Sequence, residues 1–344
     1  MSRMTRIKDV AEFANVSTAT VSRILNNDPS LSVSGETRKR VLEVVNELNY
    51  KPGRRKRTKA VQDKDSYNVG LVLTNDEAID PYFMSIRQGA ESACDEYSVK
   101  IASVFNIGKS NFSSDSMAQL DGLIVLGDVN SEELQGVYSH NPNIVFVDFL
   151  PEEVNVDVVI SDFETATRKI LDHLFSNGHS QIAYIGGKGL IRSIHNGRTI
   201  EKDDIRLKTY ERMMKEKGLF EEDNVLVGEF GPMSGYTLMK RLIGQKSFPS
   251  AVVIASDPMA IGAMKALHEA GLKVPGDISI FSFDDIVASA FLNPTLSTVK
   301  VHTEEMGRTA VKLLVDRMKN GRELPLKVIL PTELVVRESS GPLL

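Results

Sequence analysis

The N-terminal part of the chain carries the feature that most constrains its fold, namely three short stretches in which apolar residues recur at helical spacing. The first stretch places four apolar residues at i, i+3, i+4 and i+7, which is one stripe of a short helix. These residues are Ile7, Val10, Ala11 and Ala14. Asn15 follows as a turn residue, because asparagine tolerates left-handed backbone dihedrals. The pattern predicts a compact helical unit over residues 5–52.

Two further helices complete this unit. Ser17 is positioned to cap the second helix, because its hydroxyl can accept a hydrogen bond from a backbone N–H that the first turn leaves unpaired. Val21 and Leu25 share the inner face of that helix. Ser34 is the corresponding cap of the third helix. The third helix is expected to close the small core with Val41, Leu42, Val45 and Leu48.

The outward face of the second helix carries polar residues suited to DNA. A short helix, a tight turn and a second short helix can place one helix in the major groove. Arg23 can donate two hydrogen bonds to guanine, while Thr18 and Ala19 are short enough to approach base edges. The residues better suited to phosphate contacts are Ser17, Ser22 and Asn26. A plain solvated face is the alternative interpretation, and it accounts less well for this combination.

Charge is distributed unevenly along the chain. Residues 1–60 hold 13 Lys and Arg against 6 Asp and Glu, a balance of +7. Since the whole chain has 41 against 46, the remainder has 28 against 40, a balance of −12. A basic N-terminal part on an acidic body indicates a polyanionic partner for the N-terminal part alone.

The composition also indicates the cellular compartment in which the protein is expected. No apolar run approaches the roughly 18 residues of a membrane helix, and the N-terminus lacks the apolar core of a secretory signal. Cys94 is the single cysteine, so no internal disulfide can form. We therefore expect a cytoplasmic protein without a membrane partner.

From Tyr67 onward, short apolar runs alternate with amphipathic helices, which predicts an α/β body of parallel sheets covered on both faces. The runs expected to form strands are YNVGLVL, VKIASVF, LDGLIVLG, NIVFVDF, VVIS, QIAYIGG, NVLVGEF, SAVVIAS, DISIFSF and STVKV. They fall into two groups on either side of residues 161–180. We therefore expect two doubly wound lobes, with a small ligand bound between them at the strand ends.

These patterns divide the chain into three parts. We expect a DNA-binding unit, a basic linker, and an effector-binding and dimerisation region, over residues 1–52, 53–66 and 67–344 respectively. FLNPTLSTV suggests a connection between lobes. The expected lobes combine residues 67–161 with 294–325, and 162–293 with 326–344.

The sequence contains no catalytic constellation that we can identify. GGKG at residues 186–189 does not complete a dinucleotide-binding GxGxxG, and no GxxxxGK[ST] phosphate loop occurs. His173 and His179 flank a helix end and do not have the spacing of a metal pair. No GxSxG nucleophile elbow occurs. We therefore expect no enzyme activity, no cofactor and no metal.

Two runs of the N-terminal unit, DVAEFANVSTATVSRILNN and VSGETRKRVLEVVNELNYKP, closely resemble the DNA-binding head of the LacI/GalR family of bacterial repressors. The resemblance continues through almost the whole chain, at DPYFMSIRQGAE, HLFSNGHSQIAYIGG and NPTLSTV. It implies a helix-turn-helix head, a body related to periplasmic sugar-binding proteins, and base reading by Thr18, Ala19 and Arg23. Several details look closest to repressors of galactose and β-galactoside operons.

The resemblance also implies an effector site. A sugar is held by polar groups that bind adjacent hydroxyls and by an aromatic face that packs on its C–H side. The implied polar set is Asp148, Arg206 and Asp284, with Phe230 as the stacking platform. Further implied candidates are Thr74, Tyr82, Phe83 and Ser256. Asp257 is expected instead to cap the following helix, and Asp285 to serve the fold.

Each candidate has a plainer interpretation. An acidic residue at a strand end is often only a helix cap, Phe230 could be ordinary core, and Arg206 could form a surface ion pair worth about 0–1 kcal/mol. One departure from the family concerns the stretch between Val104 and Leu120, which is too short for the helix that many members have there.

Together these observations predict a transcriptional repressor of a carbohydrate operon. Two heads match two half-sites of a near-palindromic operator, so we expect a homodimer on double-stranded DNA. The expected effector is a small sugar, with galactose or a galactoside as the first candidate. A regulator that responds to a purine or a phosphoprotein is the alternative, and a sugar-metabolising enzyme is a weaker one.

The linker departs from the family pattern. In relatives it folds as a hinge helix on DNA and wedges a leucine into the minor groove, whereas the matching position here is Lys59. Lysine unstacks a base step poorly, but Arg54, Arg55 and Lys59 can neutralise phosphates. We therefore expect the linker to bind DNA mainly by charge.

Replacing Arg54–Arg57 with glutamine should reduce the dependence of operator affinity on salt. Each lost phosphate contact lowers the slope of log affinity against log salt by about 0.9. Fluorescence anisotropy over a series of salt concentrations measures this slope, and an unchanged slope would contradict the expectation.

Overall fold

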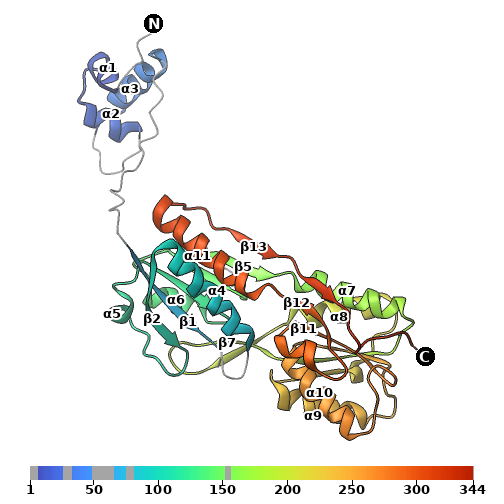
Figure 1. Ribbon diagram of the computed structural model, residues 1–344. Helices are drawn as coiled ribbons and strands as arrows, with labels where there is room; N and C mark the ends of the chain where they lie inside the picture. The colour runs from blue at the N-terminus through green and yellow to red at the C-terminus, as the bar shows by residue number, and fades with distance from the viewer. Residues whose placement is uncertain (1–6, 26–32, 49–65, 75–80, 152–155, 344) are drawn as a thin grey trace. The chain divides into compact units, whose positions relative to one another are not determined.

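A computed structural model describes residues 7–25, 33–48, 66–74, 81–151 and 156–343 of the chain (Figure 1). The chain divides into two compact units, Met1–Asp63 and Lys64–Leu344, which we call the head and the body. Each unit has its own hydrophobic core.

The head contains the three predicted helices, α1 Ile7–Phe13, α2 Thr18–Leu25 and α3 Gly35–Glu47. Asn15 has a φ of 49° and turns the chain between α1 and α2, as predicted. The backbone N–H of Thr20 donates to Oγ of Ser17 at 3.0 Å, and that of Thr37 donates to Oγ of Ser34 at 3.2 Å. Both predicted caps are therefore confirmed, because each satisfies an N–H that the first helical turn leaves unpaired.

The core of the head differs from the prediction at one position of α3. Val41 and Val44 are buried and Val45 is half-buried, whereas Leu42 is 44% exposed. The inward stripe of α3 therefore runs through positions 41, 44, 45 and 48, and Leu42 lies one residue, about 100° of helical rotation, off this stripe. In α2, Val21 is buried in the same core as predicted, and so is Ile24, whereas the side chain of Leu25 lies outside what the structure describes.

The first sheet of the body is wholly parallel, with the strand order β13–β5–β4–β3–β1–β2. Its strands are β1 Tyr67–Leu73, β2 Val99–Asn106, β3 Gly122–Leu126, β4 Ile144–Val147, β5 Asp157–Ser161 and β13 Lys327–Leu330. We call this sheet and its helices the first lobe.

The second sheet has the order β14–β12–β11–β10–β6–β9 and is parallel except for β14, which runs antiparallel to β12. Its strands are β6 Ile182–Gly187, β9 Val225–Gly228, β10 Ala251–Ile254, β11 Ser279–Asp284, β12 Ser297–Lys300 and β14 Glu333–Val335. Every predicted strand is present with small shifts at its ends, so the predicted α/β class is confirmed. Sequence reasoning missed β13, β14 and a separate hairpin of β7 Gly189–Arg192 and β8 Thr199–Lys202.

Helices cover both faces of each sheet (Figure 1). In the first lobe, α4 Pro81–Tyr97 and α11 Thr303–Asn320 cover one face, and α5 Ser114–Met117 and α6 Ser131–Val137 cover the other. In the second lobe, α7 Phe163–Ser176 and α8 Ile205–Glu216 lie opposite α9 Pro232–Ile243 and α10 Asp257–Glu269. Two-sided burial explains why the strands are near-continuous apolar runs.

The short stretch before β3 still covers its face of the first sheet. It forms only the four-residue helix α5, yet Phe112, Met117 and Leu120 are buried in one cluster with Phe105 of β2. These few large side chains replace the apolar face of a full helix.

The α4–α11 contact depends on two glycines. A Cβ atom at Gly89 would lie 2.0 Å from the carbonyl oxygen of Glu304, and one at Gly307 would lie 2.0 Å from that of Ile86. Only glycine permits this approach of the two backbones. The close contact holds α11 against the first lobe. The strand before α11, β12, belongs to the second sheet, whereas the strand after it, β13, belongs to the first.

Two strands belong to the opposite lobe from the one that we expected. β12 pairs with β11 and so belongs to the second sheet, although residues 294–325 were expected in the first lobe. β13 pairs with β5 and so belongs to the first sheet, although residues 326–344 were expected in the second lobe. The chain crosses between β12 and α11 and again between β13 and β14, in short connections without a change of composition that could reveal them.

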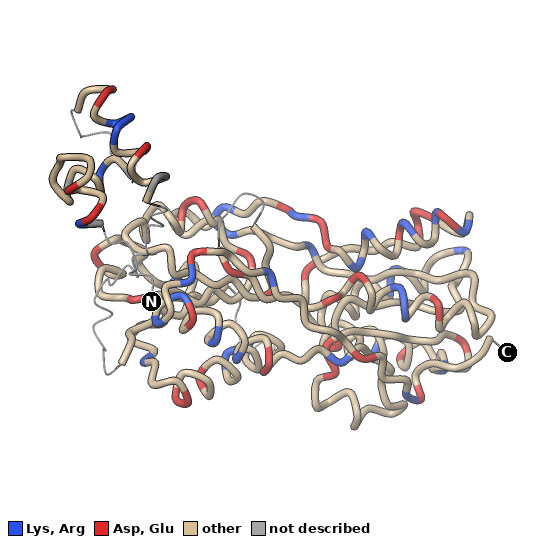
Figure 2. Tube along the Cα trace, turned by 90° about the horizontal axis from the view of Figure 1, so that it is seen from above, with Lys and Arg blue, Asp and Glu red and all other residues tan. Residues whose placement is uncertain are grey.

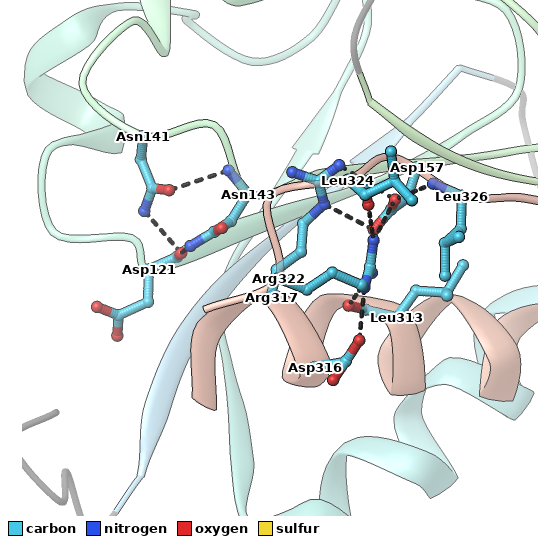
Figure 3. Close-up of polar contacts among 10 residues, drawn as sticks. All are labelled: Asp121, Asn141, Asn143, Asp157, Leu313, Asp316, Arg317, Arg322, Leu324 and Leu326. Carbon is cyan, nitrogen blue, oxygen red and sulfur yellow. Dashed lines mark hydrogen bonds and ion pairs between the residues drawn. The ribbon is translucent and has the colours of Figure 1, made fainter. Parts of the chain in front are cut away.

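Asp157, at the start of β5, organises the return of the chain into the first lobe (Figure 3). Its carboxylate accepts hydrogen bonds from Nε of Arg317 at 2.7 Å, from Nη2 of Arg322 at 2.6 Å and from the backbone N–H of Leu326 at 2.7 Å. Burial alone would raise the pKa of Asp157, but the two arginines outweigh it and the pKa is lowered. One carboxylate thus fixes α11 and the segment leading into β13.

Replacing Asp157 with alanine should destabilise the body by about 3–5 kcal/mol, because it leaves a buried arginine without its partner. Urea unfolding followed by circular dichroism measures this loss of free energy. The matched control is Asp316→Ala, which removes a 39%-exposed partner of Arg322 and should cost about 0–1 kcal/mol. Equal losses for the two variants would contradict this account of Asp157.

Candidate DNA-binding and effector sites

The candidate DNA interface is the outward face of α2 in the head. Ser17, Thr18 and Arg23 are exposed there, and Ala19 and Ser22 lie in the same helix. Asn26, Arg54, Arg55 and Lys59 lie outside the described residues, so their predicted contacts stay predictions. In the body, basic and acidic residues are interspersed along the chain (Figure 2).

The candidate effector site begins with Tyr82 and Asp148 in the first lobe. The Tyr82 hydroxyl donates to Oδ1 of Asp148 at 2.9 Å, which joins α4 to the end of β4. Asp148 has a φ of 63°, a left-handed conformation in which the chain turns sharply as it leaves the strand. Burial and then the Asp148 carboxylate raise the pKa of Tyr82 well above its usual value, so the hydroxyl remains a donor.

Arg206 provides a largely buried cation from the second lobe. Its Nε and Nη2 donate to the two carboxylate oxygens of Asp204, the N-cap of α8, at 2.9 and 2.5 Å, and its Nη1 donates to the carbonyl oxygen of Ala255 at 2.6 Å. Burial alone would lower the pKa of Arg206, but Asp204 outweighs it and the pKa is raised. The guanidinium carbon lies between 4.8 and 5.6 Å from three aromatic ring centres, those of Phe163, Phe230 and Phe283.

Charges of the two lobes act on one another at this place. Burial raises the pKa of Asp148 to about 7, while Lys202 opposes the rise and Asp128 adds to it. Arg206, from the second lobe, also lowers the pKa of Asp148, and Asp284 raises that of Tyr82. The charge of Arg206 therefore reaches Asp148 in the first lobe and Asp284 in the second.

Asp284 and Phe230 occupy the second-lobe side. Asp284 ends β11 and is buried, with a φ of 113° that is strained for any residue other than glycine; such strain is common at ligand sites. Phe230 follows β9 and is 40% exposed, so it is not ordinary core. Its ring lies against the backbone of Gly187, where a Cβ atom would be only 2.4 Å away.

The remaining candidates have structural contacts. Oγ of Ser256 accepts from the N–H of Met259 and caps α10, the role that the sequence assigned to Asp257. Asp257 is fully buried and structural, but it acts by accepting hydrogen bonds from Ser282, Ser289, Thr298 and the N–H of Ile286. The expected cap at Asp257 was wrong because the preceding serine takes that place.

Thr74 and Phe83 of the first lobe, and Asp285 of the second, also make contacts within the fold. Thr74 is buried and donates from Oγ1 to the carbonyl oxygen of Leu126. Phe83 is buried and packs edge-on against Tyr82 at 5.1 Å between ring centres. Asp285 forms an ion pair with Arg337 at 2.7 Å, in keeping with its expected structural role.

Sequence reasoning missed several members of this cluster, namely Asp128, Lys202, Asp204, Phe163 and Phe283. Asp204 could have been found, because an aspartate just before an amphipathic run is a typical N-cap. Lys202 could have been found from Asn196-Gly197, a strong hairpin signal between two short runs. Neither signal shows that the hairpin reaches the first lobe.

Among the described residues, no group of His, Cys, Asp and Glu is arranged to hold a metal ion. No helix in the part of the chain that the structure describes is long and apolar enough to cross a membrane.

Comparison with known proteins agrees with this architecture. Residues 6–53 match the family model "Bacterial regulatory proteins, lacI family", and residues 171–340 match "Periplasmic binding protein-like domain". The HTH-type transcriptional repressor MelR of Bacillus subtilis (strain 168) is 44% identical, over 98% of this chain and 98% of its own length.

Two solved structures are also similar over nearly the whole chain. The lac repressor dimer bound to operator and the anti-inducer ONPF has a TM-score of 0.68 at 27% identity, covering 98% of this chain and 100% of that one. The complex of the transcriptional regulator CelR with cellobiose has a TM-score of 0.67 at 27% identity, with the same coverage. The confirmed elements, the helix-turn-helix head and the two-lobed body, are those of these proteins. The chain therefore belongs to the LacI family of bacterial regulatory proteins.

Proposed function

We propose that this protein is a transcriptional repressor of a carbohydrate operon and that a neutral sugar bound between its lobes controls its binding to operator DNA. Two contacts carry the proposal: Tyr82 donates to Asp148 in the first lobe, and Arg206 lies 5.5 Å from the ring centre of exposed Phe230 in the second, with its charge acting on Asp148. The head of the same chain exposes Arg23 on the helix α2. Because it would act on operator DNA, we place the protein in the cytoplasm.

The head supports sequence-specific DNA binding through α2. Arg23 is exposed on this helix and suits bidentate donation to guanine, with Thr18 and Ala19 near the base edges at the helix start. Ser17, Ser22 and Asn26 would position the helix on phosphates, and Arg54, Arg55 and Lys59 would add charge contacts from the linker.

The charge balance of the body favours a neutral effector over a phosphorylated one. Arg206 is paired with Asp204, and Lys202 with Asp128 at 2.5 Å. Two further carboxyl groups, those of Asp148 and Asp284, belong to the same cluster. A phosphate would meet like charge here, whereas sugar hydroxyls can donate to carboxylates and the C–H face of the ring can pack on Phe230.

Galactose or a galactoside is our first candidate, on the strength of the sequence resemblance to repressors of galactose and β-galactoside operons. The cellobiose complex of the similar regulator CelR supports an unphosphorylated saccharide in this type of body. We propose Thr74, Tyr82, Phe83 and Ser256 as residues that shape the same site.

We also propose that two copies of the body associate. The short helix η2, Val287–Phe291, exposes 81% of Val287 and 82% of Phe291. A groove of about 580 Å³ lies beside it, lined in part by Ile261, Met264 and Leu292. A second copy would cover these apolar side chains and supply the second head that a two-part operator needs.

A thermal-shift screen of the full-length protein tests the effector class. Galactose or a methyl galactoside at about 100 times its Kd should add about 2.7 kcal/mol to the free energy of unfolding. Galactose 6-phosphate and purines should give no shift. Stabilisation by purines or sugar phosphates alone would contradict the proposed effector.

The pH dependence of galactose affinity tests the role of Asp148. Its pKa of about 7 means that the carboxylate, the better acceptor for a sugar hydroxyl, forms as pH rises from 6 to 8, so affinity should rise over this range. The same raised pKa makes Asp148 destabilise the sugar-free fold as pH rises above its ordinary value of 3.8 towards 7. Calorimetry should therefore show rising affinity for the wild type and a flat profile for Asp148→Asn; equal profiles would exclude this role.

Replacing Phe291 with aspartate should weaken the dimer about 30-fold or more, because exposed aromatic residues are frequent centres of binding energy. Sedimentation equilibrium measures the dissociation constant. The control is Leu343→Asp, which changes another exposed apolar residue, 51% exposed, whose backbone N–H donates to the carbonyl oxygen of Asn177 at the end of α7. A dimer that tolerates Phe291→Asp as well as Leu343→Asp would argue against this interface.

A further inference from the structure

The hairpin β7–β8 belongs to the second lobe by its position in the chain. It follows β6 directly and leads into α8, which carries Arg206. Its two strands pair only with each other within the sheets that the structure describes. The turn is closed by a hydrogen bond from the N–H of Ser193 to the carbonyl oxygen of Arg198 at 2.8 Å, and Gly197 has a φ of 68°.

The tip of the hairpin nevertheless contacts the first lobe, and Figure 1 places β7 beside elements of that lobe. The N–H of Arg192 donates to the carbonyl oxygen of Asp128 at 3.2 Å, and its carbonyl accepts from the N–H of Asn130 at 2.8 Å. These bonds form a short parallel bridge between Arg192 and Val129, in the segment between β3 and α6. The backbones of the two lobes are therefore joined outside the main crossings.

Glu133 of α6 binds the two residues that follow Arg192, namely Ser193 and Ile194. Its Oε2 accepts from Oγ of Ser193 at 2.8 Å and from the backbone N–H of Ile194 at 2.9 Å. The side chain of Ile194 is only 7% exposed and is buried in the apolar cluster of the first lobe, with residues such as Val129 and Phe149. A second-lobe residue thus completes the core of the first lobe.

The end of the hairpin brings a cation to the same place. Nζ of Lys202 lies 2.5 Å from Oδ1 of Asp128 and 5.2 Å from the ring centre of Phe149. Lys202 stands four residues before Arg206, and its charge acts on Asp148. The hairpin therefore runs from its contact on α6 to the cluster that we propose as the effector site.

We propose that the β7–β8 hairpin is a clasp between the lobes, fastened to the first lobe by Glu133, and that it positions Lys202 at the effector site opposite Asp128. The second half of this inference rests on the proposed function, whereas the first half does not. Glu133 is a positioning residue, because it acts through the hairpin. Movement of one lobe against the other has to strain or release this clasp.

Hydrogen–deuterium exchange of the ligand-free, full-length protein tests the clasp. Glu133→Ala removes the acceptor of two hydrogen bonds, so exchange in residues 189–202 should become about tenfold faster or more. Glu133→Gln should stay close to the wild type, because its amide oxygen can accept both bonds. Glu132→Ala, at the exposed neighbouring position of the same helix, should change nothing. Exchange in Glu133→Ala equal to that of the wild type would overturn the clasp.

A second variant keeps the test decisive if Glu133→Ala does not fold. Ile194→Ala shortens the side chain that the hairpin inserts into the first lobe and leaves both hydrogen bonds to Glu133 possible. It should also speed exchange in residues 189–202, and normal exchange in this variant would likewise overturn the clasp.

Calorimetric titration with galactose tests the second half of the inference. The Kd of Glu133→Ala should be about tenfold higher than that of the wild type, which is about 1.4 kcal/mol, while Glu133→Gln and Glu132→Ala should bind normally. Normal galactose affinity in Glu133→Ala, with fast exchange, would overturn the positioning of Lys202 alone. If the wild type itself does not bind galactose, the proposed effector is wrong, and the exchange experiment still decides the clasp.

Discussion

The parallel direction of the strands is the constraint on which the rest of the body depends. In a parallel sheet every strand ends at the same edge, so the residues that follow the strands gather there. Thr74, Asp128 and Asp148 follow β1, β3 and β4 of the first sheet, while Phe230 follows β9 and Asp284 ends β11 of the second. The candidate effector site is therefore a consequence of topology, built from short segments that are distant in sequence.

Charge then decides what such a site can hold. Arg206 is buried, but Asp204 and the Ala255 carbonyl accept its hydrogen bonds, and three phenylalanine rings surround it. A buried guanidinium without such partners would be costly. These partners fix the position of Arg206, whereas burial raises the pKa of Asp148 to about 7, so its charge depends on pH near neutrality.

Much of the fold follows from local patterns. The caps Ser17 and Ser34, the turn at Asn15 and the apolar strands were predictable, because each depends on residues close in sequence. Leu42 was misplaced because adjacent apolar residues on α3 leave the inward stripe ambiguous by one position. The exchange of β12 and β13 between the sheets was not predictable, because strand pairing is decided by partners far along the chain.

The proposed members of the candidate effector site came from family resemblance. Spacing alone does not bring Tyr82 to Asp148, and it does not distinguish the capping Ser256 from the buried Asp257. The clasp could not be predicted from the sequence, because Glu133 and Ile194 meet only where a hairpin of one lobe extends to the other. Contacts of this kind need the three-dimensional structure.

We propose that a sugar bound between the lobes controls the binding of the head to operator DNA. The most direct test is anisotropy of a labelled operator, selected from random duplexes, titrated with full-length protein with and without galactose. We expect a change in operator affinity of about 5- to 150-fold, with an equal change in galactose affinity when operator is bound. Arg23→Ala should lose operator binding, and Arg206→Ala should keep it but lose the response to galactose. Galactose binding that leaves operator affinity unchanged would contradict the account.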